Sequence, residues 1–316
     1  MARAARRAPG PSGRGPSAWS RARALALAAA LAPCACSKIT YLPDNPIAGW
    51  SPPVVLMHRG GGNDCGPGLP CWPNTLPAVL HGFDVLDGAE VDIQLSADGT
   101  LWLGHDNEVI DCAGNFVGSC FQDLHDSQID LVAYCDRTAP AACTAGSSAD
   151  CIQHYVRAEE VIAAITGVPD KKISLDIKGQ YCKSLGIADA QRIGDEVVRL
   201  VRTYPMGDRV LAESEQINFV DTVVGSGAPV LTFMNALGGV DRALGSASTR
   251  GADGISFKWQ TDVMDADVVA GIHRKGFRVI IWTIDSPADI AAAWAAVPDV
   301  IESDNPDFFL YVTPQP

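Results

Sequence analysis

The sequence predicts an α/β protein in which eight parallel strands, each followed by a helix, close into a (β/α)8 barrel of the TIM type. Short β-branched runs alternate with amphipathic stretches across residues 54–312. Eight such runs fit the length of about 250 residues that this barrel needs. The rival is a doubly wound open sheet, but no Gly-x-Gly-x-x-Gly fingerprint follows the first run.

The expected strands are short runs rich in Val, Ile and Leu. They are Val54–His58, Ala89–Gln94, Lys172–Ile177, Arg209–Ala212, Pro229–Phe233, Gly254–Phe257, Arg278–Thr283 and Asp299–Glu302. Amphipathic helices are expected between most of them, including Ala188–Thr203, Ile217–Val224, Ala266–Lys275 and Pro287–Ala296. This order predicts strand–helix–strand units and a parallel sheet.

One region, from about residue 107 to 156, interrupts the alternation. It has no clear hydrophobic period, but it contains five cysteines and many aspartates and small residues. A stretch this long within a compact domain is usually functional or disordered, and the cysteines favour an ordered one. We expect a Cys-rich insertion after the second strand region, lying over the mouth of the barrel.

Residues 1–36 are typical of a signal peptide. They hold six arginines and no acidic residue, followed by the apolar run Ala24–Ala32 and by small residues around Cys34 and Cys36. The pattern also resembles a bacterial lipoprotein leader, in which a lipidated cysteine attaches the protein to a membrane; the alternative is simple secretion. A Pro-rich connector, 37–53, then leads to the barrel domain, 54–312. We expect an exported protein: periplasmic, secreted, or an outer-membrane lipoprotein.

Cysteine usage agrees with export. Eight cysteines lie beyond the leader, in segments rich in Gly, Pro, Ser and Asp. An even number in such segments indicates disulfides formed in an oxidising compartment. The close pairs Cys65/Cys71 and Cys112/Cys120 are the expected partners. A zinc site is the alternative, but these cysteines form no Cys-x-x-Cys pair.

Charge limits the partners. The formal net charge is −13, and six of the 24 basic residues lie in the leader. A domain with this much negative charge repels the phosphates of nucleic acid. We therefore expect no nucleic-acid partner and a small-molecule substrate instead. No apolar run reaches the length of about 18 residues that a membrane-spanning helix needs.

Three carboxylates stand where barrel enzymes keep their active sites, at the carboxyl ends of strands. Glu90 and Asp92 are two positions apart and face the same side of one strand. Asp176 has the same position on the next barrel strand. Such carboxylates repel one another unless a cation lies between them, and oxygen ligands suit Ca²⁺ or Mg²⁺. We therefore expect one divalent cation here.

Two histidines and two cationic side chains accompany these carboxylates. His58 ends the first strand and His105 follows a short strand, so the pair can supply a general acid and a general base. Arg59 and Lys178 can hold phosphate oxygens. A glycoside hydrolase would also use paired carboxylates but would not need these cations. A non-catalytic ligand-binding surface barrel is a further alternative, because fold alone does not give function.

Motifs along residues 54–309 resemble the glycerophosphodiester phosphodiesterase family. They are His58-Arg59-Gly60, Asn74-Thr75-Leu76, Gly88-Ala89-Glu90-Val91-Asp92, Asp98-Gly99, His105-Asp106, Leu175-Asp176-Ile177-Lys178, Ile281-Trp282-Thr283 and Glu302-Ser303-Asp304-Asn305-Pro306-Asp307. The resemblance implies a metal-dependent barrel that cleaves glycerophosphodiesters to glycerol 3-phosphate and an alcohol.

The resemblance also implies a role for each matching residue. The acid/base pair is His58 and His105; the metal ligands are Glu90, Asp92 and Asp176; phosphate contacts come from Arg59 and Lys178; and Trp282 lines the substrate pocket. The sequence departs from the family at Pro73, where a glutamate is usual, and at Asp176, where the usual ligand is also glutamate. Asp176 and the Cys112–Cys120 loop resemble phospholipase D toxins that act on lysophospholipid or sphingomyelin and give a cyclic phosphate, which is the alternative function.

Overall fold

The computed structural model describes residues 53–61, 72–106, 108–109, 120–134, 153–178, 185–259 and 265–312. The chain divides into Met1–Lys38 and Ile39–Pro316, and every described residue lies in the second unit. The expected leader, its lipidation and all cysteines except Cys120 lie outside the described residues and stay predictions. Cys120 is one half of a disulfide. Among the described helices, none is both long and apolar enough to cross a membrane.

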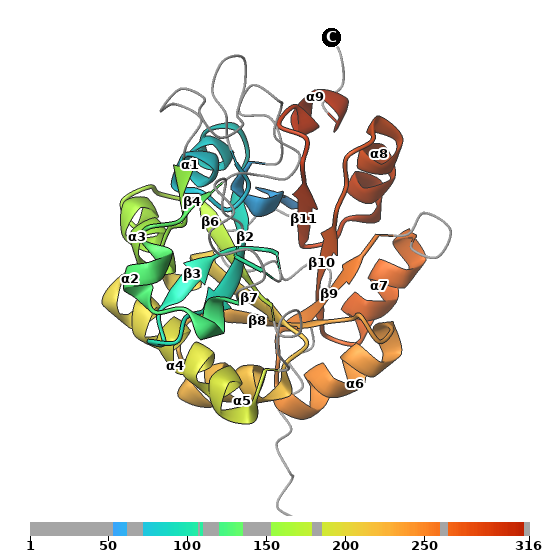
Figure 1. Ribbon diagram of the computed structural model, residues 1–316. Coiled ribbons are helices and arrows are strands. Elements are labelled where there is room, and N and C mark those ends of the chain that lie inside the picture. Colours follow the sequence, from blue (N-terminus) through green and yellow to red (C-terminus); the bar gives the residue numbers. More distant parts are fainter. Residues whose placement is uncertain are drawn as a thin grey trace, which may run out of the picture. The chain divides into compact units, whose positions relative to one another are not determined.

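Eight parallel strands close into a barrel (Figure 1). They are β1 Val54–Met57, β2 Gly88–Leu95, β6 Lys172–Ile177, β7 Val210–Ser214, β8 Leu231–Asn235, β9 Gly254–Lys258, β10 Arg278–Trp282 and β11 Val300–Ser303. Around the barrel the order is β1, β11, β10, β9, β8, β7, β6, β2, and the β1–β2 pairing closes the ring. The predicted (β/α)8 barrel is confirmed.

Helices surround the strands (Figure 1). They are α1 Leu76–Val85, α3 Ala158–Ile165, α4 Ile187–Thr203, α5 Ile217–Ser226, α6 Val240–Arg250, α7 Ala266–Arg274, α8 Pro287–Ala296 and α9 Phe308–Val312. Local chemistry explains where two of them begin. The Asp265 carboxylate accepts hydrogen bonds from the first amides of α7, and Ser286 Oγ accepts one from Asp289 N in α8.

Two strands extend two residues further than the sequence predicts. The expected strand Arg209–Ala212 is β7, which continues through Glu213 to Ser214, and the strand expected to end at Phe233 continues to Asn235. The hydrophobic pattern ends at the last apolar residue, whereas the backbone ladder continues. Polar side chains at the carboxyl ends face the lumen, so they do not end the strands.

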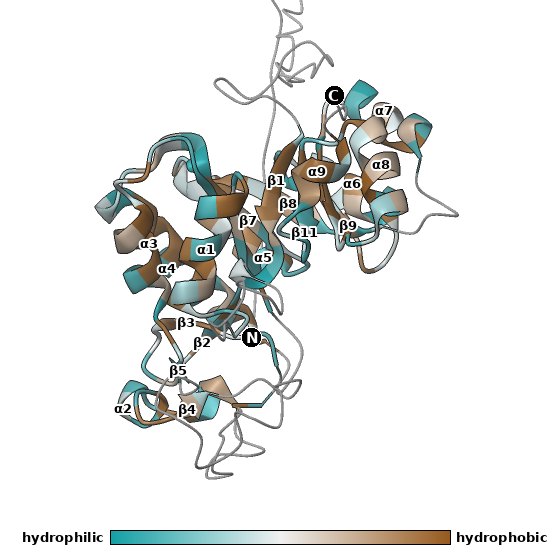
Figure 2. Ribbon diagram, turned by 90° about the horizontal axis from the view of Figure 1, so that it is seen from above, coloured by the Kyte–Doolittle hydropathy of each residue, from teal (hydrophilic) through white to brown (hydrophobic). Residues whose placement is uncertain are grey.

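The apolar core has two zones. Residues such as Val91, Leu175 and Ile255 face outward and pack against the helices. Inward-facing residues form a separate cluster within the lumen: Val54, Leu56, Leu211, Phe233, Ile280 and Val300. Figure 2 shows many of these strands in the brown of hydrophobic residues. The inner cluster forms an apolar floor beneath the carboxyl ends of the strands.

The stretch expected to be an insertion contains short elements of its own. After β3 Leu101–Leu103, which pairs antiparallel with β2, come η2 Phe121–Asp123, α2 Asp126–Ile129 and the antiparallel pair β4 Ala133–Tyr134 and β5 Gln153–His154. Trp102, Phe121, Tyr134 and other residues form a second buried cluster. These elements are two to four residues long, too short to show a hydrophobic period. Figure 2 shows α2, β4 and β5 beyond β3, to one side of the barrel.

The amino ends of the strands are joined by a repeated device. Asp87, Asp253 and Asp299 each stand immediately before a strand. Their Oδ2 atoms accept hydrogen bonds from the second amide of a neighbouring strand: Val55 N at 2.9 Å, Thr232 N at 2.8 Å and Val279 N at 2.8 Å, respectively. Each aspartate therefore ties two adjacent strands together at the end of the barrel that faces away from the predicted site.

Candidate active site

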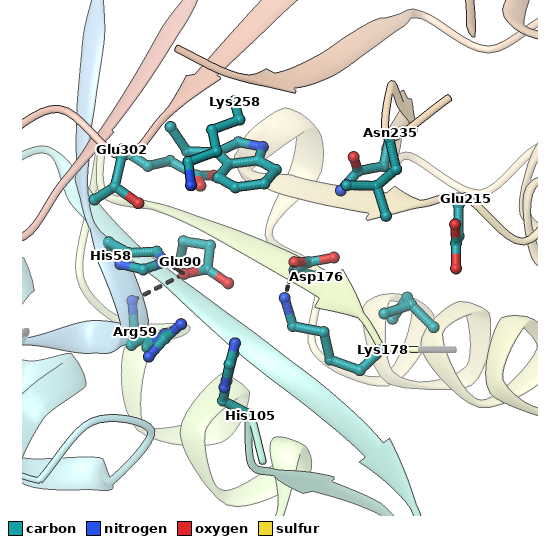
Figure 3. Close-up of a pocket in the computed structure, with 14 residues that line it drawn as sticks. His58, Arg59, Glu90, His105, Asp176, Lys178, Glu215, Asn235, Lys258 and Glu302 are labelled. Atoms are coloured by element: carbon teal, nitrogen blue, oxygen red, sulfur yellow. Dashed lines mark hydrogen bonds and ion pairs between the residues drawn. The ribbon is translucent and has the colours of Figure 1, made fainter. Parts of the chain in front are cut away.

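A cavity of about 220 Å³ opens at the carboxyl ends of the strands (Figure 3). Seven of the eight predicted site residues line it: His58, Arg59, Glu90, His105, Asp176, Lys178 and Trp282. The eighth, Asp92, is fully buried beside it. The structure therefore brings together residues from three strands, β2, β6 and β10, and from the segments that follow β1, β3 and β6, although the sequence separates some of them by more than 200 positions; the roles assigned to them stay predictions.

Three carboxylates form a compact cluster at one side of this cavity. Glu90 and Asp92 lie on β2, and Asp176 lies opposite Asp92 in the register with β6. One oxygen from each lies within 4.8 Å of the others. Burial and the charges of Asp92 and Asp176 raise the pKa of Glu90 well above its usual value. Among the described residues, Glu90 Oε1 has no hydrogen-bond partner. Crowded, partly unpartnered carboxylate oxygens fit a divalent cation.

Lys178 and Arg59 supply positive charge to the cluster. Lys178 Nζ lies 2.8 Å from Asp92 Oδ1 and also hydrogen-bonds Asp176. Arg59 Nε lies 3.5 Å from Asp92 Oδ2. Burial alone would raise the pKa of Asp92, but Lys178, His105 and Arg59 outweigh it and lower that pKa below its usual range. An ammonium group has three donors, so Lys178 can hold carboxylates and still donate to a substrate.

Asn74 fixes the orientation of Asp92. Its Nδ2 donates to Asp92 Oδ2 at 2.7 Å, and its Oδ1 accepts from Asp92 N at 2.8 Å. Its own amide donates to Arg59 O at 2.8 Å. Asn74 has a φ of 62°, in the left-handed region that asparagine tolerates better than most residues. The Asn-Thr motif thus has a local physical reason: one side chain holds a buried carboxylate and links it to the segment carrying Arg59.

His58 stands between two acids at the end of β1. Its Nδ1 lies 2.9 Å from Asp304 Oδ1, and its Nε2 lies 3.9 Å from Glu90 Oε2. Arg59 N donates to the same Glu90 oxygen at 2.8 Å. A proton on Nδ1 shared with Asp304 leaves Nε2 as a base that faces the carboxylate cluster. Asp304, which follows β11, therefore orients the imidazole.

His105 reaches the cavity from the segment after β3. Gly104, which precedes it, donates its amide to Asp92 O at 2.9 Å. A Cβ at Gly104 would lie 2.8 Å from Phe121 Cζ, so only glycine allows the insertion to pack this closely. The position of His105 thus depends on both β2 and the insertion.

The sequence did not predict roles for several residues that the structure places at the site. Asp304 and Asn74 belong to recognisable motifs, and those motifs were the signal that could have identified them as orienting residues. Glu302, which belongs to the same motif as Asp304, also lines the cavity, as do Asn235, Lys258 and Glu215. The sequence signal of the last three was weaker, because single polar residues at strand ends also occur for structural reasons.

Comparisons with known proteins agree with this geometry. A family model described as "Glycerophosphoryl diester phosphodiesterase family" matches residues 58–308. Comparison with curated proteins gives no match. Among solved structures, a glycerophosphoryl diester phosphodiesterase of Silicibacter pomeroyi has a TM-score of 0.63 and 18% identity, covering 82% of this chain and 94% of its own.

Two further solved structures have similar scores. A glycerophosphodiester phosphodiesterase of Galdieria sulphuraria has a TM-score of 0.62 and 21% identity, with 82% of this chain and 97% of its own covered. A phosphodiesterase of Oleispira antarctica, in complex with the product sn-glycerol-3-phosphate, has a TM-score of 0.62 and 15% identity, with 83% and 97% covered. These likenesses show the barrel fold, and the family match spans most of the chain. The chain belongs to the glycerophosphoryl diester phosphodiesterase family, whose members are phosphoric diester hydrolases.

Proposed function

We propose that this protein hydrolyses glycerophosphodiesters to glycerol 3-phosphate and an alcohol, using a divalent cation and the histidines His58 and His105. One observation carries the proposal: a carboxylate cluster, two histidines and two cationic side chains surround one cavity. The bound product of the Oleispira structure supports the substrate class.

Glu90, Asp92 and Asp176 would hold the cation, Ca²⁺ or Mg²⁺. Bound there, the ion would supply Lewis-acid compensation of the phosphodiester's negative charge. The carboxylates bring their own negative charge close to an anionic substrate, so they suit this reaction only when that charge is compensated. The unpartnered Glu90 Oε1 agrees with this assignment.

The chain's own side chains bind the phosphate and move protons. Arg59 and Lys178 donate to phosphate oxygens that are not displaced. One histidine takes a proton from the nucleophile, which is water or the substrate's own 2-hydroxyl, and the other gives a proton to the departing alkoxide. Asp304 at 2.9 Å holds the His58 ring in one orientation throughout.

The first test measures release of glycerol 3-phosphate from glycerophosphocholine by the purified protein, with and without chelator. Chelator should abolish the release, and Ca²⁺ or Mg²⁺ should restore it. Release that is indifferent to chelator contradicts the metal assignment. Cleavage of lysophosphatidylcholine to a cyclic phosphate, without glycerol 3-phosphate release, would support the toxin-like alternative instead.

Replacing one histidine tests the acid/base assignment. His58→Ala should lower kcat by about 100-fold to 10,000-fold, the usual contribution of general acid–base catalysis. Cation binding, measured by calorimetry, should be unchanged because His58 is not among the three proposed ligands. His154→Ala is the matched control, since His154 is exposed on β5 and should leave kcat unchanged. Full activity in His58→Ala would contradict the mechanism.

A further inference from the structure

Two buried glutamates meet across the lumen of the barrel. Glu213 on β7 is 1% exposed and Glu302 on β11 is 3% exposed. They lie just above the apolar floor formed by Leu56, Phe233 and their neighbours. Branched apolar side chains usually fill barrels of this kind, and burying acidic groups is costly unless they are paired or hydrogen-bonded. Neither glutamate belongs to the carboxylate cluster.

Hydrogen bonds link Glu213 to side chains of three other strands. Ser174 Oγ donates to its Oε1, and Ser256 and Glu302 also hydrogen-bond its carboxyl group. Ser256 Oγ in turn accepts from Trp282 Nε1 at 2.9 Å. Two carboxyl groups can hydrogen-bond each other only if one of them carries a proton. Glu213, surrounded by donors, is therefore the acceptor, and Glu302 is the donor.

Burial raises the pKa values of both glutamates. Burial and the charges of Glu213 and Glu90 raise the pKa of Glu302 well above its usual value. The pKa of Glu213 is also raised by burial, but hydrogen bonds from Glu302 and Ser174 oppose that rise.

Glu302 lines the cavity, and one of its carboxyl oxygens is buried without a partner among the described residues. Among the described residues, Glu302 Oε1 has no hydrogen-bond donor, and Glu302 lines the cavity together with His58 and Glu90 (Figure 3). A buried acceptor without a donor is unfavourable, and a ligand can remove that cost. Lys258 lines the same cavity, and together with the proposed cation at the carboxylate cluster it would disfavour a further cationic group. A neutral donor, a hydroxyl group, therefore fits this wall.

We propose that Glu302 Oε1 accepts a hydrogen bond from the terminal hydroxyl of the substrate's glycerol, and that Glu213 is a positioning residue that holds Glu302. The other glycerol hydroxyl, next to the phosphate-bearing carbon, stays close to the phosphorus and the histidines. The terminal hydroxyl is the one able to reach a different wall. This inference rests on the proposed function and deepens it, since it names the residue that selects a glycerol ester.

The test compares two substrates that release the same alcohol. One is glycerophosphocholine; the other is 2-hydroxypropyl phosphocholine, which keeps the hydroxyl near the phosphate and lacks the terminal one. Choline release gives kcat/KM for both in the same assay. The wild-type protein should prefer the glycerol ester by about 10-fold to 100-fold, because the analogue leaves a buried acceptor unpartnered.

Three variants separate hydrogen bonding from packing. Glu302→Met removes both hydrogen-bonding atoms and should reduce the preference to about unity. Glu302→Gln should keep it, because its amide group donates to Glu213 and its carbonyl still accepts from the hydroxyl. Glu302→Ser, too short to reach the substrate, should also lose the preference and replaces Glu302→Met if that variant does not fold.

The matched control is Asp299→Asn, which changes an equally buried carboxyl at the opposite end of β11 and should leave the preference unchanged. An undiminished preference in Glu302→Met or Glu302→Ser would overturn the inference. Loss of preference in Glu302→Gln as large as in Glu302→Met would overturn the assignment of a protonated Glu302. If the wild-type protein cleaves neither ester with Ca²⁺ or Mg²⁺, the proposed function itself fails, and this inference fails with it.

Discussion

The two ends of the barrel use acidic residues in opposite ways. At the amino ends, Asp87, Asp253 and Asp299 each accept a backbone amide from a neighbouring strand. At the carboxyl ends, the partners of Asp92 and Glu90 include cations and other carboxylates, and one Glu90 oxygen has no partner among the described residues. The first arrangement is complete without a ligand, whereas the second is not.

This difference separates structural from functional acids. Burial alone does not distinguish the two ends, since Asp299 and Glu90 are each 1% exposed. What differs is the crowding of like charges: each amino-end aspartate precedes a different strand and holds an amide of its neighbour, whereas the carboxylates of the cluster lie side by side and are unfavourable until a ligand compensates them. Strongly shifted pKa values with charged partners in a cavity mark a candidate site.

Among the changes that test this comparison, Lys178→Met should have the largest effect on activity. It removes the cation closest to Asp92 and one proposed phosphate contact, so we expect kcat/KM for glycerophosphocholine to fall by about 100-fold to 1,000-fold, as for loss of a group that stabilises the transition state. The assay uses saturating Ca²⁺ or Mg²⁺. Lys275→Met, at an exposed position after α7, is the control. Unchanged activity in Lys178→Met would show that Lys178 compensates the charge of the carboxylates and does not contribute to phosphate binding.

Asp299→Asn should have the opposite effect: lower stability with unchanged activity. Asp299 Oδ2 accepts from Val279 N and lies 3.0 Å from His273 Nε2. Weakening both contacts should lower the free energy of unfolding by about 1–3 kcal/mol. Urea denaturation followed by circular dichroism measures this change. Activity at 25 °C should not change, and a large loss of kcat in the folded variant would contradict the division between the two ends.

We expect the smallest effect at a histidine–aspartate pair that lies at neither end of the barrel. In the insertion, His125 Nδ1 lies 2.7 Å from Asp98 Oδ1, and this hydrogen bond raises the pKa of His125 and lowers that of Asp98. The histidine's contribution is fully present below its unfolded pKa and is lost as the pH rises through its folded pKa. The aspartate's contribution is lost as the pH falls through its own lowered pKa.

Titration by NMR tests this pair. Asp98→Asn should return the pKa of His125 toward its ordinary value, while kcat at neutral pH stays unchanged. His154, on β5 and hydrogen-bonded to a backbone carbonyl, serves as an internal reference in the same spectra. A His125 titration unaffected by Asp98→Asn would mean that the contact contributes nothing in solution.

The sequence predicted the barrel well because its strands are short, apolar and regularly spaced. It also predicted which residues gather at the cavity, since carboxyl ends of parallel strands share one end of a barrel. It could not predict the partners of those residues. The hydrogen bonds from Asn74 to Asp92 and from Asp304 to His58 depend on side-chain directions that spacing does not determine.

The short elements of the insertion and the contact between Glu213 and Glu302 could not be predicted from the sequence either. Elements as short as β4 and β5 have no detectable period, so their pairing was not predictable. Glu213 and Glu302 are 89 positions apart on strands that are not neighbours. Only the closed barrel, which places β7 opposite β11, brings them into contact.

The two histidines are attached to different parts of the protein, and this has an evolutionary consequence. His58 is attached to the barrel, whereas His105 follows β3, whose Trp102 packs in the core of the insertion with Phe121. Mutations that reshape the insertion can therefore move one member of the histidine pair while the barrel keeps its carboxylates in place. Divergence among barrels of this kind can change which esters react by altering an appendage, so the scaffold and its selectivity can evolve at different speeds.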